Sequence, residues 1–291
     1  MTGPVISVPS LQGLLASGEP VVLLDVRWAL GHTDGHKQYE RGHIPGAVYV
    51  DLEKELAAPA GDGSGGRHPL PEPEDFHRTV RGWGINPGDT VVVYDAVSGT
   101  SAARAWWLLR HAGLESVYLL DGGIVAWHRA GFALQGGKVE PDPGSIELSW
   151  GRMPVVQMWD VPSVVATGRL IDARAKERYR GDREPVDPRA GHIPGAVNAP
   201  AADNLTEDGA FFRPPEELRT AYEALGVRRG DPVAVYCGSG VSAAHDVVAL
   251  ELAGYRAALY PGSWSQWSST KGSPVAVGTQ AGEWPGAAKR R

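Results

Sequence analysis

The chain has 291 residues, of which 42% are hydrophobic and 21% are charged, and its formal net charge is −6. This length suits about two domains of roughly 100–200 residues each, and the negative charge does not favour binding to nucleic acid or to anionic lipid. No run of about 18 apolar residues occurs, so we expect no membrane-spanning segment. The single cysteine, Cys237, excludes an internal disulfide framework and a multi-cysteine metal site. The first residues do not resemble a secretory leader, so we expect a cytoplasmic protein. The nine histidines are scattered along the chain, and we expect neither a metal nor a cofactor.

Two copies of one pattern divide the chain. Short segments of the first half return in the same order about 140–150 residues later. The matched segments are 23–27 and 170–174, 42–48 and 191–197, 91–95 and 233–237, 101–104 and 242–245, and 121–127 and 261–267. We therefore predict an N-terminal domain over residues 1–135, a Gly/Pro-rich linker over 136–150, and a C-terminal domain of the same fold over 151–291.

Each copy alternates predicted strands and helices. In chain order, the first copy has apolar runs at 21–26 and 90–94, a helical pattern at 102–112 and a further strand at 116–120, and the second copy repeats them at 169–173, 232–236, 243–253 and 257–260. This alternation predicts an α/β fold, with two domains that each hold a mostly parallel sheet flanked by helices on both faces. The glycine-rich segment 61–66 predicts a flexible surface loop.

Cys237 is the candidate nucleophile. It follows the strand predicted at 232–236, precedes a glycine-containing turn, and is followed by a helix from about Ala243. Backbone N–H groups in such a turn, together with the helix dipole, bind anions and favour the thiolate. The alternative is a buried cysteine that only fills space. The first copy has Asp95 at this position, which predicts one active domain and one scaffold domain.

The loop from Cys237 to Ser242, Cys-Gly-Ser-Gly-Val-Ser, resembles the active-site loop of tandem rhodanese-type sulfurtransferases, and most closely the C-G-S-G-V-[ST] pattern of 3-mercaptopyruvate sulfurtransferases. Both copies of Gly-His-Ile-Pro-Gly-Ala support the resemblance. It implies two domains with five-stranded parallel sheets and a catalytic cysteine in the second alone. It also implies that a sulfane sulfur passes from a small-molecule donor through a Cys237 persulfide to cyanide or a thiol, with a thioredoxin-like reductant as a further partner.

The neutral Gly238 and Ser239 favour a monoanionic donor such as 3-mercaptopyruvate over the dianion thiosulfate, which stays the alternative donor. The resemblance implies that Arg178 binds the donor carboxylate together with a second arginine, for which Arg189 is the nearest match and Arg183 a rival. The other substrate-binding positions that it implies are the loop residues Gly238, Gly240, Val241 and Ser242.

The resemblance further implies a relay in which Ser239, His43 and Asp34 deliver a proton to the departing pyruvate enolate. The alternative for His43 is a structural role at its turn, because His192 occupies the same motif in the second copy, where no catalytic role is needed. Asp34 lies in a loop that also contains His32 and His36.

Two other functions remain open at this point. Dual-specificity phosphatases share the rhodanese-like fold but need an arginine six residues after the cysteine, where this chain has Ala243. A non-catalytic regulatory or binding protein is the alternative from a different class. Uptake of sulfur by Cys237 from a sulfane donor separates that alternative from an enzyme.

Overall fold

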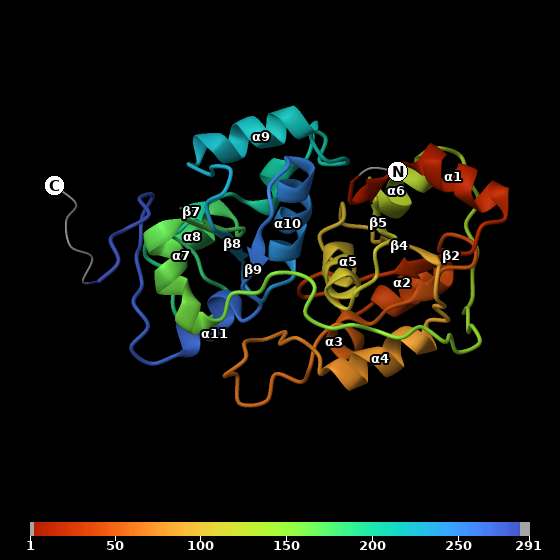
Figure 1. Ribbon diagram of the computed structural model, residues 1–291, viewed down its shortest axis with the longest axis horizontal. Coiled ribbons are helices and arrows are strands. Elements are labelled where there is room, and N and C mark those ends of the chain that lie inside the picture. Colours follow the sequence, from red (N-terminus) through yellow and green to blue (C-terminus); the bar gives the residue numbers. More distant parts are fainter. Residues whose placement is uncertain (1–2, 286–291) are drawn as a thin grey trace. The chain divides into compact units, whose positions relative to one another are not determined.

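The computed structural model describes residues 3–285, whose contacts divide the chain into two compact units (Figure 1). The N-terminal unit consists of Met1–Ala58, Leu70–Met153 and Leu205–Phe212. The C-terminal unit consists of Pro59–Pro69, Pro154–Asn204 and Arg213–Arg291. Each unit therefore contains a short segment that comes from the other half of the sequence, and residues 136–150 belong to the N-terminal unit.

The N-terminal unit is built on a five-stranded sheet with the order β1-β5-β4-β2-β3, in which all neighbouring strands are parallel. Its strands are β1 (Val5–Ile6), β2 (Val21–Asp25), β3 (Val48–Tyr49), β4 (Thr90–Tyr94) and β5 (Val117–Leu120). Its helices are α1 (Val8–Ser17), α2 (Gly35–Arg41), α3 (Leu52–Glu55), α4 (Pro73–Gly82), α5 (Ala102–His111) and α6 (Gly123–Arg129). The parallel α/β architecture agrees with the prediction.

The C-terminal unit repeats this plan with a four-stranded parallel sheet of order β7-β6-β8-β9. Its strands are β6 (Arg169–Asp172), β7 (Val197–Asn198), β8 (Val233–Tyr236) and β9 (Ala258–Leu259). Its helices are α7 (Val161–Thr167), α8 (Lys176–Arg180), α9 (Pro215–Ala224), α10 (Ser242–Leu252) and α11 (Ser263–Ser269), with 3-10 turns η1 (Met158–Asp160) and η2 (Ala201–Asn204). Where we expected a fifth strand, a single parallel bridge joins Val155 to Leu259.

The central strands β4 and β8 end on equivalent tyrosines that organise the neighbouring turn. The hydroxyl of Tyr94 accepts the N–H of Ile44 at 3.0 Å, and that of Tyr236 accepts the N–H of Ile193 at 3.1 Å. Both isoleucines belong to the repeated Gly-His-Ile-Pro-Gly-Ala motif. All residues of β8 are buried, as expected for a parallel strand that is covered on both faces. The next residue is Cys237, at the carboxyl edge where parallel sheets bind ligands.

Candidate active site

Cys237 lies in the turn between strand β8 and helix α10. Its side chain is buried, and its Sγ accepts the N–H of Gly240 at 3.2 Å. Gly240 has φ +78°, and a Cβ atom added there would lie 2.6 Å from the carbonyl oxygen of Pro261. Only glycine fits this turn. Val241 and Ser242 follow at the start of α10, whose helix dipole favours negative charge beside the sulfur.

The backbone around Cys237 is held by the segment that leads into helix α11. The N–H of Cys237 donates to Oγ of Ser263 at 3.1 Å, and its carbonyl accepts the N–H of Trp264 at 2.9 Å. Ser263 is buried with φ +54°, a left-handed conformation that is unfavourable for a residue other than glycine. The equivalent residue of the first copy is Gly123, also at φ +54°. Ser263 was not among the predicted site residues, although this exchange of glycine for serine was visible in the repeat.

Asp95 occupies the corresponding turn of the N-terminal unit. Its fully buried carboxylate accepts four backbone N–H groups at 2.8–2.9 Å, those of Val97, Gly99, Ser101 and Ala102. Burial raises the pKa of Asp95, and these four hydrogen bonds oppose that rise. The amides of this turn thus bind a carboxylate of the chain itself. This first copy has no nucleophile at the position.

Ser239 pairs with a histidine that we did not predict. Nδ1 of His68 lies 2.7 Å from Oγ of Ser239, and both side chains are buried. His68 belongs to the segment Pro59–Pro69, which forms part of the C-terminal unit. We expected a flexible surface loop at 61–66, and the residue that follows this loop is held to the C-terminal unit, because the N–H of Arg67 donates to Oγ of Ser265 at 3.0 Å.

His43, the histidine that we predicted for the relay, makes structural contacts within the N-terminal unit. Its ring is fully buried, its Nδ1 lies 2.9 Å from the carbonyl oxygen of Tyr39, and it stacks on the Tyr39 ring at 4.1 Å. His192 repeats this arrangement with Tyr179, at 2.8 Å and 3.8 Å. The shared geometry favours the structural alternative for both histidines, and the hydrogen bond to Ser239 comes from His68 instead.

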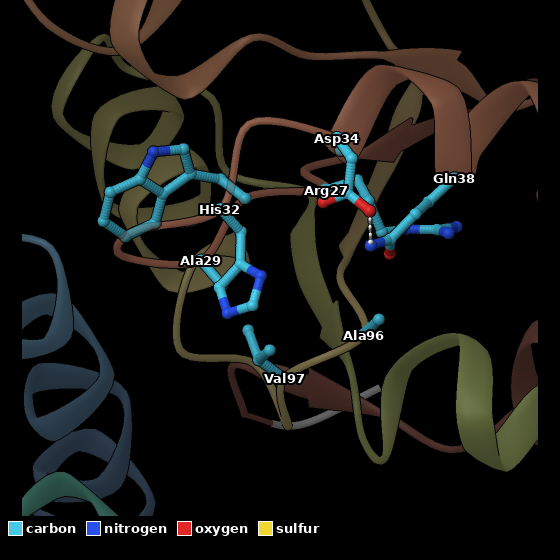
Figure 2. A pocket seen from close by; sticks show the side chains of 9 residues that line it. Arg27, Ala29, His32, Asp34, Gln38, Ala96 and Val97 are labelled. Carbon is cyan, nitrogen blue, oxygen red and sulfur yellow. Dashed lines mark hydrogen bonds between the residues drawn. The ribbon is translucent and has the colours of Figure 1, made fainter.

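Asp34 lies on the surface of the N-terminal unit. Its carboxylate accepts a hydrogen bond from Nε2 of Gln38 at 2.9 Å, which lowers the pKa of Asp34 (Figure 2). It lines a pocket of about 210 Å³ together with Arg27, His32 and Val97. Within residues 3–285, Asp34 and His43 share no hydrogen bond. The predicted order Ser–His–Asp is therefore not assembled through these two residues.

Two guanidinium groups converge on the residue that follows Cys237. A Cβ atom added to Gly238 would lie 3.0 Å from Nη2 of Arg67 and 3.4 Å from Nη1 of Arg178. Nε of Arg67 is buried and has no hydrogen-bond partner in the described part of the chain. Arg178 is the predicted carboxylate-binding residue, whereas Arg67 was not predicted. These guanidinium N–H groups lie close to the loop, where they can form hydrogen bonds with an anionic substrate.

Two carboxylates balance these arginines. Asp187 forms ion pairs with Nη1 of Arg67 and, at 2.9 Å, with Nη2 of Arg178. Glu184 binds Arg178 at 2.7 Å and Arg174 at 3.2 Å. Burial raises the pKa of Asp187, with Arg67 opposing the rise. Burial, the largest single influence, would also raise the pKa of Glu184, but the hydrogen bonds from Arg178 and from the backbone of Asp187 and Val186, together with the charge of Arg178, outweigh it and the pKa is lowered.

Arg189 makes a different set of contacts from those that we predicted. Its Nε, Nη1 and Nη2 each donate to a backbone carbonyl at 2.7 Å, those of Ser268, Ser273 and Trp267. Its guanidinium therefore ties helix α11 to the following segment and has few donors left for a carboxylate. The rival Arg183 is exposed, and only its backbone N–H, which donates to Glu177, makes a hydrogen bond among the described residues.

Neither a metal site nor a membrane span is found in the described part of the chain. No group of three or more His, Cys, Asp or Glu residues between positions 3 and 285 is arranged to hold a metal ion. Within the same residues, no helix combines the length and the apolar character that crossing a bilayer requires.

The model of the rhodanese-like domain matches the chain twice, at residues 7–130 and 157–270. The chain belongs to the rhodanese-like family. SseB of Mycobacterium tuberculosis, named for thiosulfate sulfurtransferase activity, is 45% identical over 278 residues, which cover 94% of this chain and 97% of SseB. The 3-mercaptopyruvate sulfurtransferase of Escherichia coli is 37% identical, over 88% of this chain and 92% of that protein. The crystal structure of SseA from Escherichia coli matches with a TM-score of 0.80 and 33% identity, over 90% of this chain and 99% of SseA.

Proposed function

We propose that this rhodanese-like protein is a sulfurtransferase that moves a sulfane sulfur from 3-mercaptopyruvate through a persulfide on Cys237 to cyanide or a thiol. The proposal rests on three features that meet at one loop. Cys237 precedes the N-terminus of helix α10, the guanidinium groups of Arg67 and Arg178 approach Gly238, and Ser239 pairs with His68. Together these groups supply a nucleophile, an anion site and a proton donor.

In the first half-reaction, the Cys237 thiolate attacks the sulfur of 3-mercaptopyruvate. A sulfur–sulfur bond forms and the carbon–sulfur bond breaks, so its electron pair leaves with the carbon as the enolate of pyruvate. The enolate then takes one proton to become pyruvate. The N–H of Gly240 and the dipole of α10 favour negative charge at the sulfur before the attack and on the persulfide afterwards.

We assign delivery of that proton to Ser239 and His68. The hydroxyl of Ser239 lies in the loop next to the nucleophile, and His68, within hydrogen-bond distance at 2.7 Å, can replace the proton that the hydroxyl gives up. His68 takes the place that the sequence analysis gave to His43.

We assign the donor carboxylate to Arg67 and Arg178, because both guanidinium groups approach Gly238. Two charged donors fix the orientation of a carboxylate and so hold the reacting sulfur near the thiolate. Arg189, whose guanidinium binds backbone carbonyls, is a structural residue in this assignment.

In the second half-reaction, cyanide or a thiolate attacks the outer sulfur of the persulfide. The new bond to the acceptor forms while the sulfur–sulfur bond breaks, and its electron pair restores the Cys237 thiolate. Because the chain has a single cysteine, no second thiol of the same chain can attack the persulfide, form a disulfide with Cys237 and release the outer sulfur as sulfide. A small acceptor or a thioredoxin-like reductant must therefore collect it, and we predict that this takes place in the cytoplasm.

Thiosulfate is the second candidate donor, favoured by the name of SseB at 45% identity. Its leaving group is sulfite, which is stable as an anion and, unlike the enolate of pyruvate, does not have to be protonated at a carbon atom. The ratio of kcat/KM for 3-mercaptopyruvate and thiosulfate, measured with cyanide as the common acceptor, tests our choice. We expect 3-mercaptopyruvate to be preferred, and a ratio that strongly favours thiosulfate would contradict the choice of donor.

A further inference from the structure

Asp187 is placed where it affects the charge of the anion site. Its side chain is buried and ion-paired to both Arg67 and Arg178, the two residues whose guanidinium groups approach Gly238. Glu184 is paired to Arg178 as well. The charges of the two arginines are thus matched by those of Asp187 and Glu184, so the four side chains have no net charge before a donor enters.

A carboxylate in this position acts differently on donors of different charge. It holds both arginines in place, which helps any anion that they bind, but it also repels that anion. Repulsion grows in proportion to the charge of the donor, so a dianion such as thiosulfate is disfavoured about twice as strongly, in free energy, as a monoanion such as 3-mercaptopyruvate. The low dielectric around buried groups makes this difference larger than it would be in water.

We propose that Asp187 is a specificity-determining residue of the donor site, where its negative charge selects monoanionic donors against dianionic donors. This inference rests on the proposed function for the identity of the reaction, but its test does not require turnover. Asp187 does not contact the reacting sulfur in this scheme: it holds Arg67 and Arg178 in place, and its charge repels the anion that they bind.

The test measures donor binding by calorimetry in a Cys237→Ser background, which prevents reaction. Asp187→Asn keeps the shape and removes the charge, whereas Asp182→Asn removes the same charge from an exposed residue of the same segment. We expect Asp187→Asn to lower the Kd of 3-mercaptopyruvate by about threefold and that of thiosulfate by about tenfold. The donor charge is doubled in thiosulfate, so the change in binding free energy is doubled and the ratio of wild-type Kd to variant Kd is squared. Asp182→Asn should change both values less than twofold or so.

Equal changes for the two donors, no change, or weaker binding of both would overturn the inference, and weaker binding of both is what a purely structural role predicts. If Asp187→Asn lowers the melting temperature, Asp187→Ser gives the same charge comparison with a smaller side chain. The proposed function fails by a different observation, namely that the wild-type protein gains no sulfur on Cys237 from any sulfane donor. The two failures are therefore distinguishable.

Discussion

Oγ of Ser239 and Nδ1 of His68 lie 2.7 Å apart in the C-terminal unit, although the two residues are 171 positions apart in the sequence. Ser239 is two residues beyond the proposed nucleophile, and His68 comes from a segment that precedes the whole C-terminal repeat. Both side chains are buried, so the pair is shielded from water. A shielded hydroxyl–imidazole pair next to a thiol suits proton transfer to a reacting donor.

Replacing His68 tests this proton transfer. We expect His68→Ala to lower kcat with 3-mercaptopyruvate by about 100-fold, because general acid catalysis contributes about 10²–10⁴-fold. With thiosulfate the loss should be much smaller, since sulfite leaves without taking a proton on carbon. Steady-state rates with both donors and cyanide as acceptor give the comparison.

His43→Ala is the matched control. Its ring stacks on Tyr39 within the N-terminal unit, so its loss should lower the melting temperature and change kcat little. A large loss of kcat in folded His43→Ala, together with normal activity of His68→Ala, would restore the relay that the sequence suggested.

The arginines give a second prediction. Arg67→Gln and Arg178→Gln should each raise KM for 3-mercaptopyruvate by about 10–100-fold, because each removes a charge-assisted hydrogen bond worth about 1.5–3 kcal/mol. Arg189→Gln should instead lower the melting temperature and leave KM near its wild-type value, because Arg189 binds carbonyls of the chain. Saturation curves and thermal unfolding of the three variants separate these roles. A raised KM in Arg189→Gln alone would contradict our assignment.

Asp246 gives a prediction about pH. It is fully buried on helix α10, accepts a hydrogen bond from Asn204 at 2.8 Å, and its Oδ2 has no hydrogen-bond partner among the described residues. Burial raises the pKa of Asp246 well above its ordinary value. The folded protein therefore keeps this carboxyl protonated at pH values where the unfolded chain has ionised it. Above the unfolded pKa of about 3.9, the group lowers the free energy of unfolding by about 1.4 kcal/mol per pH unit, up to the folded pKa.

Asp246→Asn removes this effect, because an amide does not titrate. We expect the variant to gain stability over the wild type progressively as the pH rises above the unfolded pKa of about 3.9, as measured by urea unfolding. Asp231→Asn, at an exposed residue, is the control and should show no such trend. A stability difference that stays constant with pH would mean that Asp246 is ionised in the folded protein.

The two-domain α/β fold was predictable because the repeat preserves the residues that build the sheet edge. Tyr94 and Tyr236 end equivalent strands and bind equivalent turns, so the order of the matched segments predicted the architecture. The position of Cys237 followed from the same reasoning. Among residues 3–285, a single bridge between Val155 and Leu259 stands in the C-terminal sheet where the resemblance implied a fifth strand.

Two residues of the proposed site, Arg67 and His68, were not predicted, because they lie in a segment of the first half of the chain that packs in the C-terminal unit. This segment is Pro59–Pro69. No hydrophobic periodicity reveals which unit such a loop contacts. One signal was present, because an adjacent arginine and histidine directly follow a run of glycines. The contacts of Arg189 could not be predicted for a related reason, since a sequence does not show that backbone carbonyls of the chain bind a guanidinium.

The proposed function requires that Cys237 carries the transferred sulfur. Intact-mass spectrometry of the wild-type protein after treatment with 3-mercaptopyruvate, and then with cyanide, tests it most directly, with Cys237→Ser as the control. We predict a gain of one sulfur atom that maps to Cys237, is absent from Cys237→Ser, and is lost on addition of cyanide. No gain of mass in the wild-type protein with either 3-mercaptopyruvate or thiosulfate would contradict the account.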